Sequence, residues 1–321
     1  MKVLFNTYPV AFDCPGGGEV QLMECKAALE RRGIEVLLYD PWQPQFDQAD
    51  VVHFFSVQGG SIPFCRHVKN RGLPLAISPI LWLGENKYDY ALKEIGALLE
   101  LCDVVLPNSR AEGKLLANWY KLPESKFAPV VNGVDDRFFA KGDPLIFCER
   151  FGIETPFLLN IANIEPRKNQ KRLIQASRDL EMLVILAGRI RDEAYWKECQ
   201  EYMHPGVRYI GPLEYASDLH RSAYAACKGF ILATRLETPG LAALEAAAQG
   251  VPLCITSEGC AEEYFGEHPH YVDPQSVESI RAGLKAVCGM ERSPELARLV
   301  KRRYTWDEAG RQLHEVYTRL V

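Results

Sequence analysis

The chain has 321 residues, of which 47% are hydrophobic and 25% are charged, and its formal net charge is −5. This composition is typical of a soluble globular protein. The negative balance argues against a dedicated nucleic-acid-binding protein, which would need a basic surface. The length is more than one hydrophobic core usually organises, so we expect two domains.

The ten cysteines, spread from Cys14 to Cys288, form no C-x-x-C pair. We therefore expect reduced thiols, and neither a disulfide framework nor a zinc site. The chain opens on a strand-like run at residues 1–7, without an apolar segment of signal-peptide length. No run of about 18 apolar residues occurs, so a membrane-spanning helix is not expected. We expect a cytoplasmic protein, with peripheral contact at the inner membrane face left open.

Short apolar segments alternate with helix-like segments through the first half of the chain. Strands are expected at residues 2–6, 35–39, 51–55, 75–78 and 104–106. Helices are expected at about residues 20–32, 88–101 and 110–120. Gly33 would end the first of these helices, and Asn108 and Ser109 would cap the last. Residues 126–131 then close this half.

Residues 138–156 interrupt the alternation with two glycines and two prolines, and we place the domain boundary there, after residue 150. The second half repeats the pattern. Strands are expected at residues 157–161, 182–187, 207–210, 229–232 and 252–255. Helices are expected at residues 170–177, 192–202, 215–226, 276–288 and 306–320, and another begins at Gly240.

This alternation predicts an α/β fold of two Rossmann-like, doubly wound parallel sheets. Ligands of such sheets bind beyond the carboxyl ends of the strands. We therefore expect the two domains to face each other across a ligand-binding cleft, with functional residues in the loops that follow strands.

The most informative of these loops leads into an alanine-rich helix. Glu237 and Glu245 bracket Gly240, where this helix begins. The free N–H groups and the dipole of a helix N-terminus favour an anion such as phosphate. Burying an ionised Glu245 among leucines and alanines costs free energy unless a hydrogen-bonding or charged partner compensates it. A phosphate-binding helix N-terminus beside two carboxylates that can accept hydrogen bonds from hydroxyl groups suits a nucleotide sugar. The diphosphate of such a molecule joins two polyhydroxylated rings.

A second loop, residues 162–169, follows the strand at 157–161 and carries Arg167 and Lys168. Two cations at this edge of a sheet would hold a diphosphate and stabilise its charge as it leaves. Taken alone, an adjacent basic pair is more often a solvated helix start. The acidic segment about seventy residues further on shifts the balance toward phosphate binding.

A third loop carries the glycine run Gly16–Gly18 between the first strand and the first helix. Such a run places backbone N–H groups near a ligand, although a plain strand-to-helix turn would use the same residues. It is not the dinucleotide fingerprint G-x-G-x-x-G, because position 21 is Gln21.

These segments, in this order, resemble the retaining glycosyltransferases of the large family four, glycosyl transferases group 1, which has a two-domain GT-B architecture. The spacing of Glu237 and Glu245 resembles the family's E-x7-E element. Residues 164–169 resemble its diphosphate-binding loop, and residues 132–135, with Phe138 following, resemble its N-G-V-D-x-x-x-F segment. Residues 304–317 resemble its closing helix, which packs back on the N-terminal domain.

The resemblance implies an acceptor-binding domain at residues 1–150, joined by the helix at 306–321, and a nucleotide-sugar-binding domain at 151–305. It implies catalytic roles for Glu237, Lys168 and Arg167: Glu237 would face the transferred sugar, and the two cations would neutralise the diphosphate. It implies that Glu245 binds the donor ribose.

Other donor contacts are implied mainly for backbone groups. The implied positions are Gly240, Leu241, Leu213, Asn163, Gly17 and Gly18. Leu213 would lie near the base, and the two glycines would approach the donor from the other domain. Many relatives have an arginine where this chain has Asn163, so Arg167 and Lys168 would carry more of the phosphate charge.

On the acceptor side, the expected residues are His53 and Ser78. Many relatives have a sugar-contacting histidine where this chain has Ser78. His53 would reach the acceptor from the end of its strand, although a buried, satisfied histidine fits the sequence as well. Rings at Trp82, Tyr88 and Tyr90 suit sugar faces, but aromatic residues more often pack.

The basic stretch at residues 298–303 is expected to be a solvated helix face, with contact to anionic lipid as the alternative.

We expect a metal-independent transferase that moves a hexose from UDP- or GDP-sugar to a saccharide, lipid-linked or small-molecule acceptor. No cofactor and no nucleic-acid partner is expected. A nucleotide-sugar epimerase on a GT-B scaffold and a non-catalytic nucleotide-sugar-binding protein remain alternatives.

Overall fold

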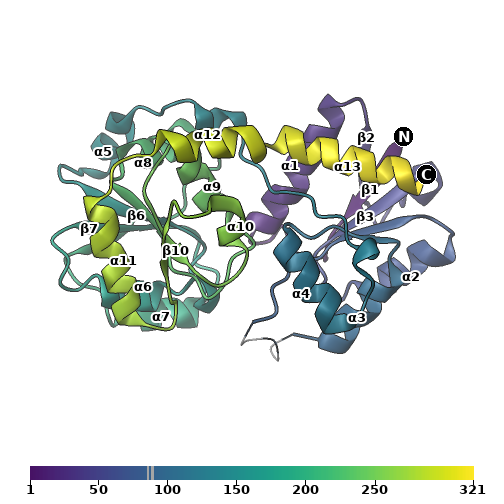
Figure 1. The fold of residues 1–321 in the computed structure, drawn as a ribbon, viewed down its shortest axis with the longest axis horizontal. Helices are drawn as coiled ribbons and strands as arrows, with labels where there is room; N and C mark the ends of the chain where they lie inside the picture. Colours follow the sequence, from purple (N-terminus) through teal and green to yellow (C-terminus); the bar gives the residue numbers. More distant parts are fainter. Residues whose placement is uncertain (85–86, 88–89) are drawn as a thin grey trace. The chain divides into compact units, whose positions relative to one another are not determined.

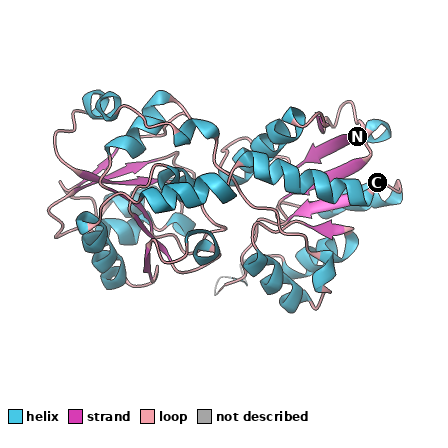
Figure 2. Cartoon of the chain, turned by 45° about the horizontal axis from the view of Figure 1, so that its top comes forward, coloured by secondary structure: helices cyan, strands magenta, loops and turns pink. Residues whose placement is uncertain are grey.

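The structure, a computed structural model, describes residues 1–84, 87 and 90–321 (Figure 1). The chain forms two compact units: Met1–Gly133 with Trp306–Val321, and Val134–Thr305. Each unit is built on one sheet that helices flank on both faces (Figure 2). All described strand pairs are parallel. The expected α/β class with two parallel-sheet domains is therefore confirmed.

The sheet of the first unit has the strand order β2-β1-β3-β4-β5. Its strands are β1 (Lys2–Asn6), β2 (Glu35–Leu38), β3 (Val51–Phe55), β4 (Leu75–Ser78) and β5 (Val104–Val105). These bounds agree with the expected strands to within one residue. Every residue of β3 and β4 is buried, as is usual for parallel strands covered on both faces.

The helices of the first unit are α1 (Gly17–Arg31), α2 (Ile62–Asn70), α3 (Leu92–Leu101), α4 (Arg110–Tyr120) and α13 (Trp306–Leu320). Short 3-10 turns lie at Phe46–Gln48 and Glu124–Lys126. We did not expect α2, whose apolar side buries only Cys65 and Val68. The helix expected at 88–101 starts at Leu92, and positions 88 and 89, with Tyr88, lie outside the described residues.

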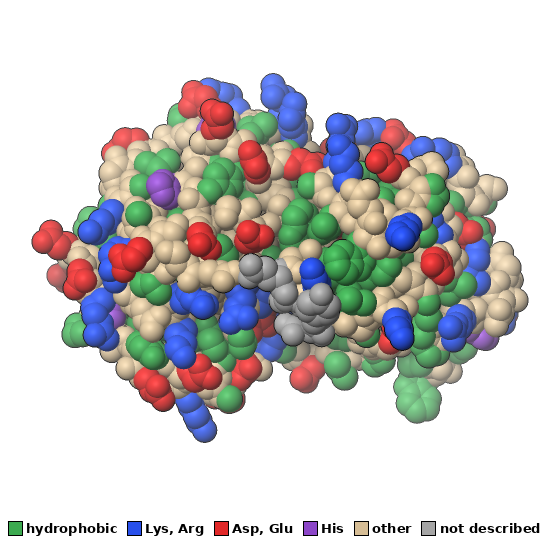
Figure 3. Space-filling view, turned by 60° about the horizontal axis from the view of Figure 1, so that its bottom comes forward, with side chains coloured by type: hydrophobic (Ala, Val, Ile, Leu, Met, Phe, Trp, Pro, Cys, Tyr) green, Lys and Arg blue, Asp and Glu red, His purple; other side chains and the backbone are tan. Residues whose placement is uncertain are grey.

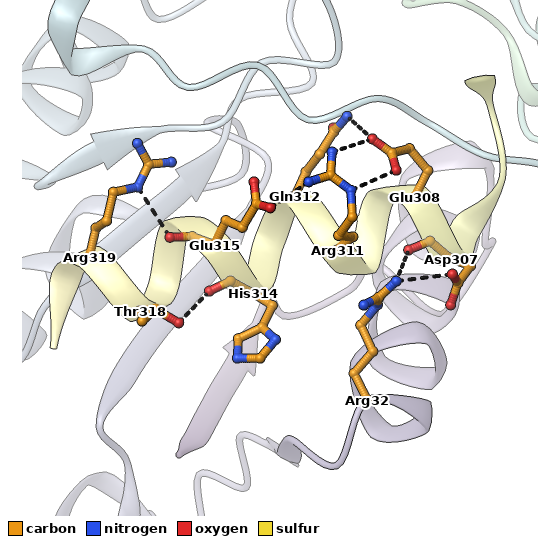
Figure 4. A network of polar contacts seen from close by, with 9 residues as sticks. All are labelled: Arg32, Asp307, Glu308, Arg311, Gln312, His314, Glu315, Thr318 and Arg319. Carbon is orange, nitrogen blue, oxygen red and sulfur yellow. Dashed lines mark hydrogen bonds and ion pairs between the residues drawn. The ribbon is translucent and has the colours of Figure 1, made fainter. Parts of the chain in front are cut away.

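The last helix, α13, returns to pack against α1 (Figure 1). A Cβ at Gly310 would lie 2.8 Å from the Cβ of Ala28, so the small residues allow the two helices to approach closely. Arg32 reaches from the end of α1 to Asp307, with 3.0 Å between guanidinium and carboxylate (Figure 4). Gln312 accepts a hydrogen bond from the backbone of Val131. These contacts make α13 part of the first unit.

The sheet of the second unit has the order β11-β10-β9-β6-β7-β8. Its strands are β6 (Phe157–Ile161), β7 (Leu183–Ala187), β8 (Val207–Tyr209), β9 (Gly229–Leu232), β10 (Leu253–Thr256) and β11 (His270–Val272). The short edge strand β11 was not expected. Because all six strands are parallel, the loops that follow them lie at one edge of the sheet.

The helices of the second unit are α5 (Pro144–Phe151), α6 (Gln170–Ala176), α7 (Glu193–Gln200), α8 (Asp218–Ala226), α9 (Leu241–Ala248), α10 (Ala261–Phe265), α11 (Val277–Gly289) and α12 (Pro294–Arg303). Two 3-10 turns, η4 (Asp136–Phe139) and η5 (Pro166–Lys168), complete it. The basic side of α12 is exposed at Lys301, Arg302 and Arg303, so the expected solvated face is present.

The second unit includes residues 134–150, whereas we expected the first domain to extend to residue 150. The glycines and prolines interpreted as a linker instead delimit a helix: Asp143 caps α5, and Gly152 ends it in the left-handed conformation. Phe147 is fully buried, and its amide donates to Ser222 of α8 at 2.8 Å. Docking on α8 therefore assigns this segment to the second unit.

On the face drawn in Figure 3, acidic and basic side chains are interspersed, in keeping with the small net charge of −5. Among the residues that the structure describes, none forms a helix long and apolar enough to span a bilayer.

Candidate functional site

Five expected site residues lie in the loops that follow β6 and β9, which are neighbours in the sheet of the second unit. Asn163, Arg167 and Lys168 follow β6, and Glu237 and Gly240 follow β9. The backbone N–H of Arg235 donates to the carbonyl of Arg167 at 2.9 Å, which ties the two loops together. The parallel pairing of two strands thus unites residues that are about seventy positions apart in sequence.

Lys168 and Glu237 form an ion pair, with 2.5 Å between Nζ and Oε1. Their side chains are 14% and 6% exposed, so the pair is largely removed from solvent. Burial tends to raise the pKa of Glu237, but Lys168 and Arg167 outweigh it and hold that pKa below its usual value. Burial, with Arg167 beside it, lowers the pKa of Lys168. The carboxylate therefore stays ionised at neutral pH and holds the ammonium in place.

The backbone of Glu237 is fixed by the loop that follows β10. Its N–H donates to the carbonyl of Glu258 at 3.1 Å, and its carbonyl accepts from Cys260 at 3.0 Å. Gly259 lies between these partners, and a Cβ there would come within 2.0 Å of the Glu237 carbonyl oxygen. Only a glycine fits this approach, and we had not singled out Gly259. The sequence signal that could have indicated Gly259 is its position shortly after the strand β10.

The N-terminus of α9 lies beside the same carboxylate. Gly240 has a φ of +89°, and a Cβ there would lie 2.8 Å from Leu232 and 3.2 Å from Oε2 of Glu237. Both the left-handed conformation and the crowding require glycine. The first N–H groups of α9, those of Leu241 and Ala242, therefore lie close to the Lys168–Glu237 pair, whereas Ala243 and Leu244 donate to the carbonyl of Gly240.

Glu245 is on the same helix and is 5% exposed. The hydroxyl of Tyr224 donates a hydrogen bond to its Oε2 at 2.7 Å, and Nε2 of His220 lies 3.5 Å from the same oxygen. Both partners belong to α8. The partner that a buried carboxylate requires is thus supplied from a neighbouring helix, which the sequence pattern did not indicate.

Arg167 is oriented differently from Lys168. Its guanidinium lies 2.9 Å from Oε1 of Glu165, and Arg191 lies 3.2 Å from the other oxygen of that carboxylate. The side chain of Arg167 is 38% exposed, whereas that of Glu165 is 12% exposed. Glu165 and Arg191 were not among the expected site residues. They form a second, more accessible charged group beside the buried pair.

The loops after β6, β7 and β8 are in direct contact. A Cβ at Gly188 would lie 1.9 Å from the carbonyl oxygen of Ala162, and the Gly188 N–H donates to Gly211 at 3.0 Å. Asn163 uses its backbone carbonyl to accept from Gln170 at 2.9 Å. Leu213, two residues beyond Gly211, is partly exposed. Asn163 and Leu213 thus lie on adjoining loops at the carboxyl edge of the sheet.

His53 and Ser78 lie in the core of the first unit, not at its surface. His53 is 0% and Ser78 2% exposed. The Nδ1 of His53 lies 2.6 Å from the hydroxyl of Tyr317, and Nε2 lies 2.9 Å from Oγ of Ser78. Burial lowers the pKa of His53 to about 3. Because both ring nitrogens have protein partners, the buried-histidine alternative fits and the expected acceptor contact does not.

Gly17 and Gly18 begin α1 in the first unit, after Gly16, whose N–H donates to Glu19 at 2.6 Å. A Cβ at Gly18 would make only an ordinary 3.5 Å contact with Ile80. Packing among the described residues therefore does not require glycine at position 18. Trp82 and Tyr90, also in this unit, are partly buried.

The family model of glycosyl transferases group 1 matches residues 149–310. A stretch of 136 residues is 32% identical to O-antigen chain mannosyltransferase B of Escherichia coli and covers 39% of this chain and 35% of that protein. The chain thus matches about a third of the length of this curated relative.

Solved structures of several proteins resemble the whole chain, among them the following two. A sucrose-phosphate synthase from Thermosynechococcus elongatus has a TM-score of 0.83 at 17% identity, covering 99% of this chain and 98% of that one. HepE of Anabaena, in complex with UDP and glucose, has a TM-score of 0.79 at 14% identity, covering 99% of each chain. The chain belongs to the glycosyl transferases group 1 family and has the GT-B fold.

Proposed function

We propose that this glycosyltransferase moves a hexose from a UDP- or GDP-sugar to a saccharide or lipid-linked acceptor, with retention at the anomeric carbon and without a metal ion. The observation that carries the proposal is the grouping of Lys168, Glu237 and the N-terminus of α9, with Glu245 further along that helix. UDP as a donor nucleotide is supported by the HepE complex. A mannosyl donor and an O-antigen acceptor are supported by the Escherichia coli relative.

The donor diphosphate would lie against the start of α9, where N–H groups and the helix dipole favour an anion. Lys168 would contact it from the buried side and Arg167 from the exposed side, in keeping with their 14% and 38% exposure. Leu213 and Asn163 would lie toward the base and the phosphates. Glu245, on the same helix, would accept hydrogen bonds from the ribose hydroxyls.

Negative charge grows on the diphosphate as its bond to the sugar breaks. Lys168, held by Glu237 before substrate arrives, would stabilise that charge without reorganisation. Glu237 would then face the transferred hexose. Such fixed cations supply the charge stabilisation that a divalent ion gives in other transferases. Retention is supported by the E-x7-E resemblance, under which the leaving phosphate accepts the acceptor's proton on the same face.

The first unit would supply the acceptor side. Gly18 of this unit would approach the donor, since no described neighbour requires a glycine there and close approach of the backbone to a ligand is a common reason for one. His53 and Ser78 have no part in this proposal, because both are buried and bonded to protein groups.

The test combines binding and turnover. Calorimetry with UDP and GDP should show that the wild-type protein binds one of them and that Glu245→Gln binds it more weakly. With the matching sugar nucleotide, diphosphate should be released only when a saccharide or lipid-linked acceptor is present. A new sugar nucleotide formed without any acceptor would favour the epimerase. Binding without release, with every acceptor class tried, would favour the non-catalytic alternative.

A further inference from the structure

The side chains behind Glu245 form a cluster that the proposed function does not use. His220 and Tyr224, on α8, are 4% and 0% exposed. Phe138, on η4, is also fully buried. Its ring centroid lies 5.2 Å from that of His220 and 5.9 Å from that of Tyr224, edge-on in both cases. The three rings pack on one another, and the Tyr224 hydroxyl reaches Glu245 on α9.

The tautomer of His220 follows from its neighbours. Its Nδ1 accepts a hydrogen bond from the backbone N–H of Ala216 at 3.2 Å. Burial lowers the pKa of His220 to about 4, so the ring is neutral at pH 7. A neutral ring that accepts at Nδ1 carries its proton on Nε2. Nε2 lies 3.5 Å from Oε2 of Glu245, close enough for electrostatic attraction although no hydrogen bond forms between them.

Tyr224 acts on the same oxygen. Its hydroxyl donates to Oε2 at 2.7 Å. Residues four apart on a helix lie on one face, so His220 and Tyr224 approach the carboxylate together. Phe138 packs against both rings and limits their rotation. Glu245 therefore has its carboxylate orientation set by side chains from another helix.

We propose that Phe138, His220 and Tyr224 are positioning residues that hold the Glu245 carboxylate ready to receive the ribose hydroxyls of the donor. The inference rests on the proposed function. It assigns a role to Phe138, which is fully buried at the start of the second unit: Phe138 supports the donor-binding glutamate within that unit. A carboxylate that is held in advance loses less conformational entropy on binding.

Tyr224→Phe tests the inference, because it removes one hydroxyl and keeps the ring. Tyr271→Phe is the matched control: its hydroxyl donates to a carbonyl, that of Gly266, at the same 2.7 Å, on the edge strand β11 of the same unit. The probes are UDP and GDP, measured by calorimetry, and melting temperatures are recorded for every variant. Glu245→Gln and the double variant with Tyr224→Phe complete a cycle.

We expect Tyr224→Phe to weaken nucleotide binding up to roughly tenfold, because a carboxylate that is no longer held must be ordered when the nucleotide binds. Tyr271→Phe should bind as the wild type does. In the Glu245→Gln background, Tyr224→Phe should cause little further loss, because it acts through Glu245.

Two outcomes would overturn the inference: unchanged binding by Tyr224→Phe, or equal losses with and without Glu245. If the wild-type protein binds neither UDP nor GDP, the proposed function itself fails. If it binds and Glu245→Gln binds more weakly while Tyr224→Phe does not, the function stands and only the positioning role fails.

Discussion

The ammonium of Lys168 lies 2.5 Å from the carboxylate of Glu237, although 69 residues separate them in sequence. The pair joins the loop after β6 to the loop after β9 and lies beside the N-terminus of α9. It is largely buried, so each charge depends on the other. Removing one charge should therefore lower stability, and removing both should restore it, whereas turnover should be lost in either case.

Lys168→Met should lower both stability and turnover. Removing one partner leaves a buried charge unpaired, at a cost of about 3 kcal/mol, and loses on the order of 100- to 1000-fold in rate. The double variant with Glu237→Gln should recover most of the stability but none of the turnover. Chemical denaturation and diphosphate release measure the two effects. Equal stability of the single and double variants would show that the pair is not coupled as described.

Gly240→Ala should destabilise the second unit and disturb the site. With φ +89° and ψ +99° the backbone of Gly240 lies outside the αL region, so an alanine there costs more than the roughly 1 kcal/mol of a left-handed alanine. The new methyl group would also meet Leu232 at 2.8 Å and the Glu237 carboxylate at 3.2 Å. Gly152→Ala is the control, with a φ of +60° and no neighbour within 4 Å. Its cost should be limited to the backbone term, and its nucleotide affinity should not change. A Gly240→Ala variant no less stable than Gly152→Ala would contradict the crowding.

Stability should fall as the pH drops below about 6.5, the ordinary histidine pKa. Burial lowers the pKa of His53 to about 3 and of His220 to about 4. Between these values and 6.5 the unfolded chain binds protons that the folded chain does not, so lower pH favours unfolding. Each histidine should contribute up to about 1.4 kcal/mol per pH unit.

The histidine contribution is measured by urea unfolding between pH 4.5 and 7.5. His53→Gln should flatten the pH dependence of the first unit, whatever its effect on stability at pH 7.5. An exposed histidine would titrate alike in both states and leave no such dependence. An unchanged slope in His53→Gln would therefore mean that His53 is protonated in the folded protein.

Arg292→Ala should destabilise the second unit by about 3 kcal/mol, because several charge-assisted hydrogen bonds are lost together. The guanidinium donates to four carbonyls at the ends of α8 and α9, those of Tyr224, Ala225, Cys227 and Gln249. Lysine cannot reproduce this fork, so Arg292→Lys should recover only part of the loss. Arg298→Ala, at a side chain 70% exposed, should change stability by less than about 0.5 kcal/mol.

Local patterns predicted most of the fold. The alternation of apolar strands and helices indicated two parallel-sheet domains, because side-chain periodicity is set by neighbours in sequence. Because such patterns report only on neighbours in sequence, they also misplaced the domain boundary. Pro144 and Gly152 marked the ends of α5, not a linker, and only the docking of Phe147 on α8 revealed the unit to which α5 belongs.

By itself, the sequence determined the fold class, the family resemblance and the position of the acidic and basic candidates, since these depend on residue type and spacing. Only the tertiary structure decided which candidates meet. It paired Lys168 with Glu237, gave Glu245 its partner Tyr224, and buried His53 beneath Tyr317, 264 residues away. Such contacts depend on how distant elements pack, and the free energy of that packing leaves no periodic signal along the chain.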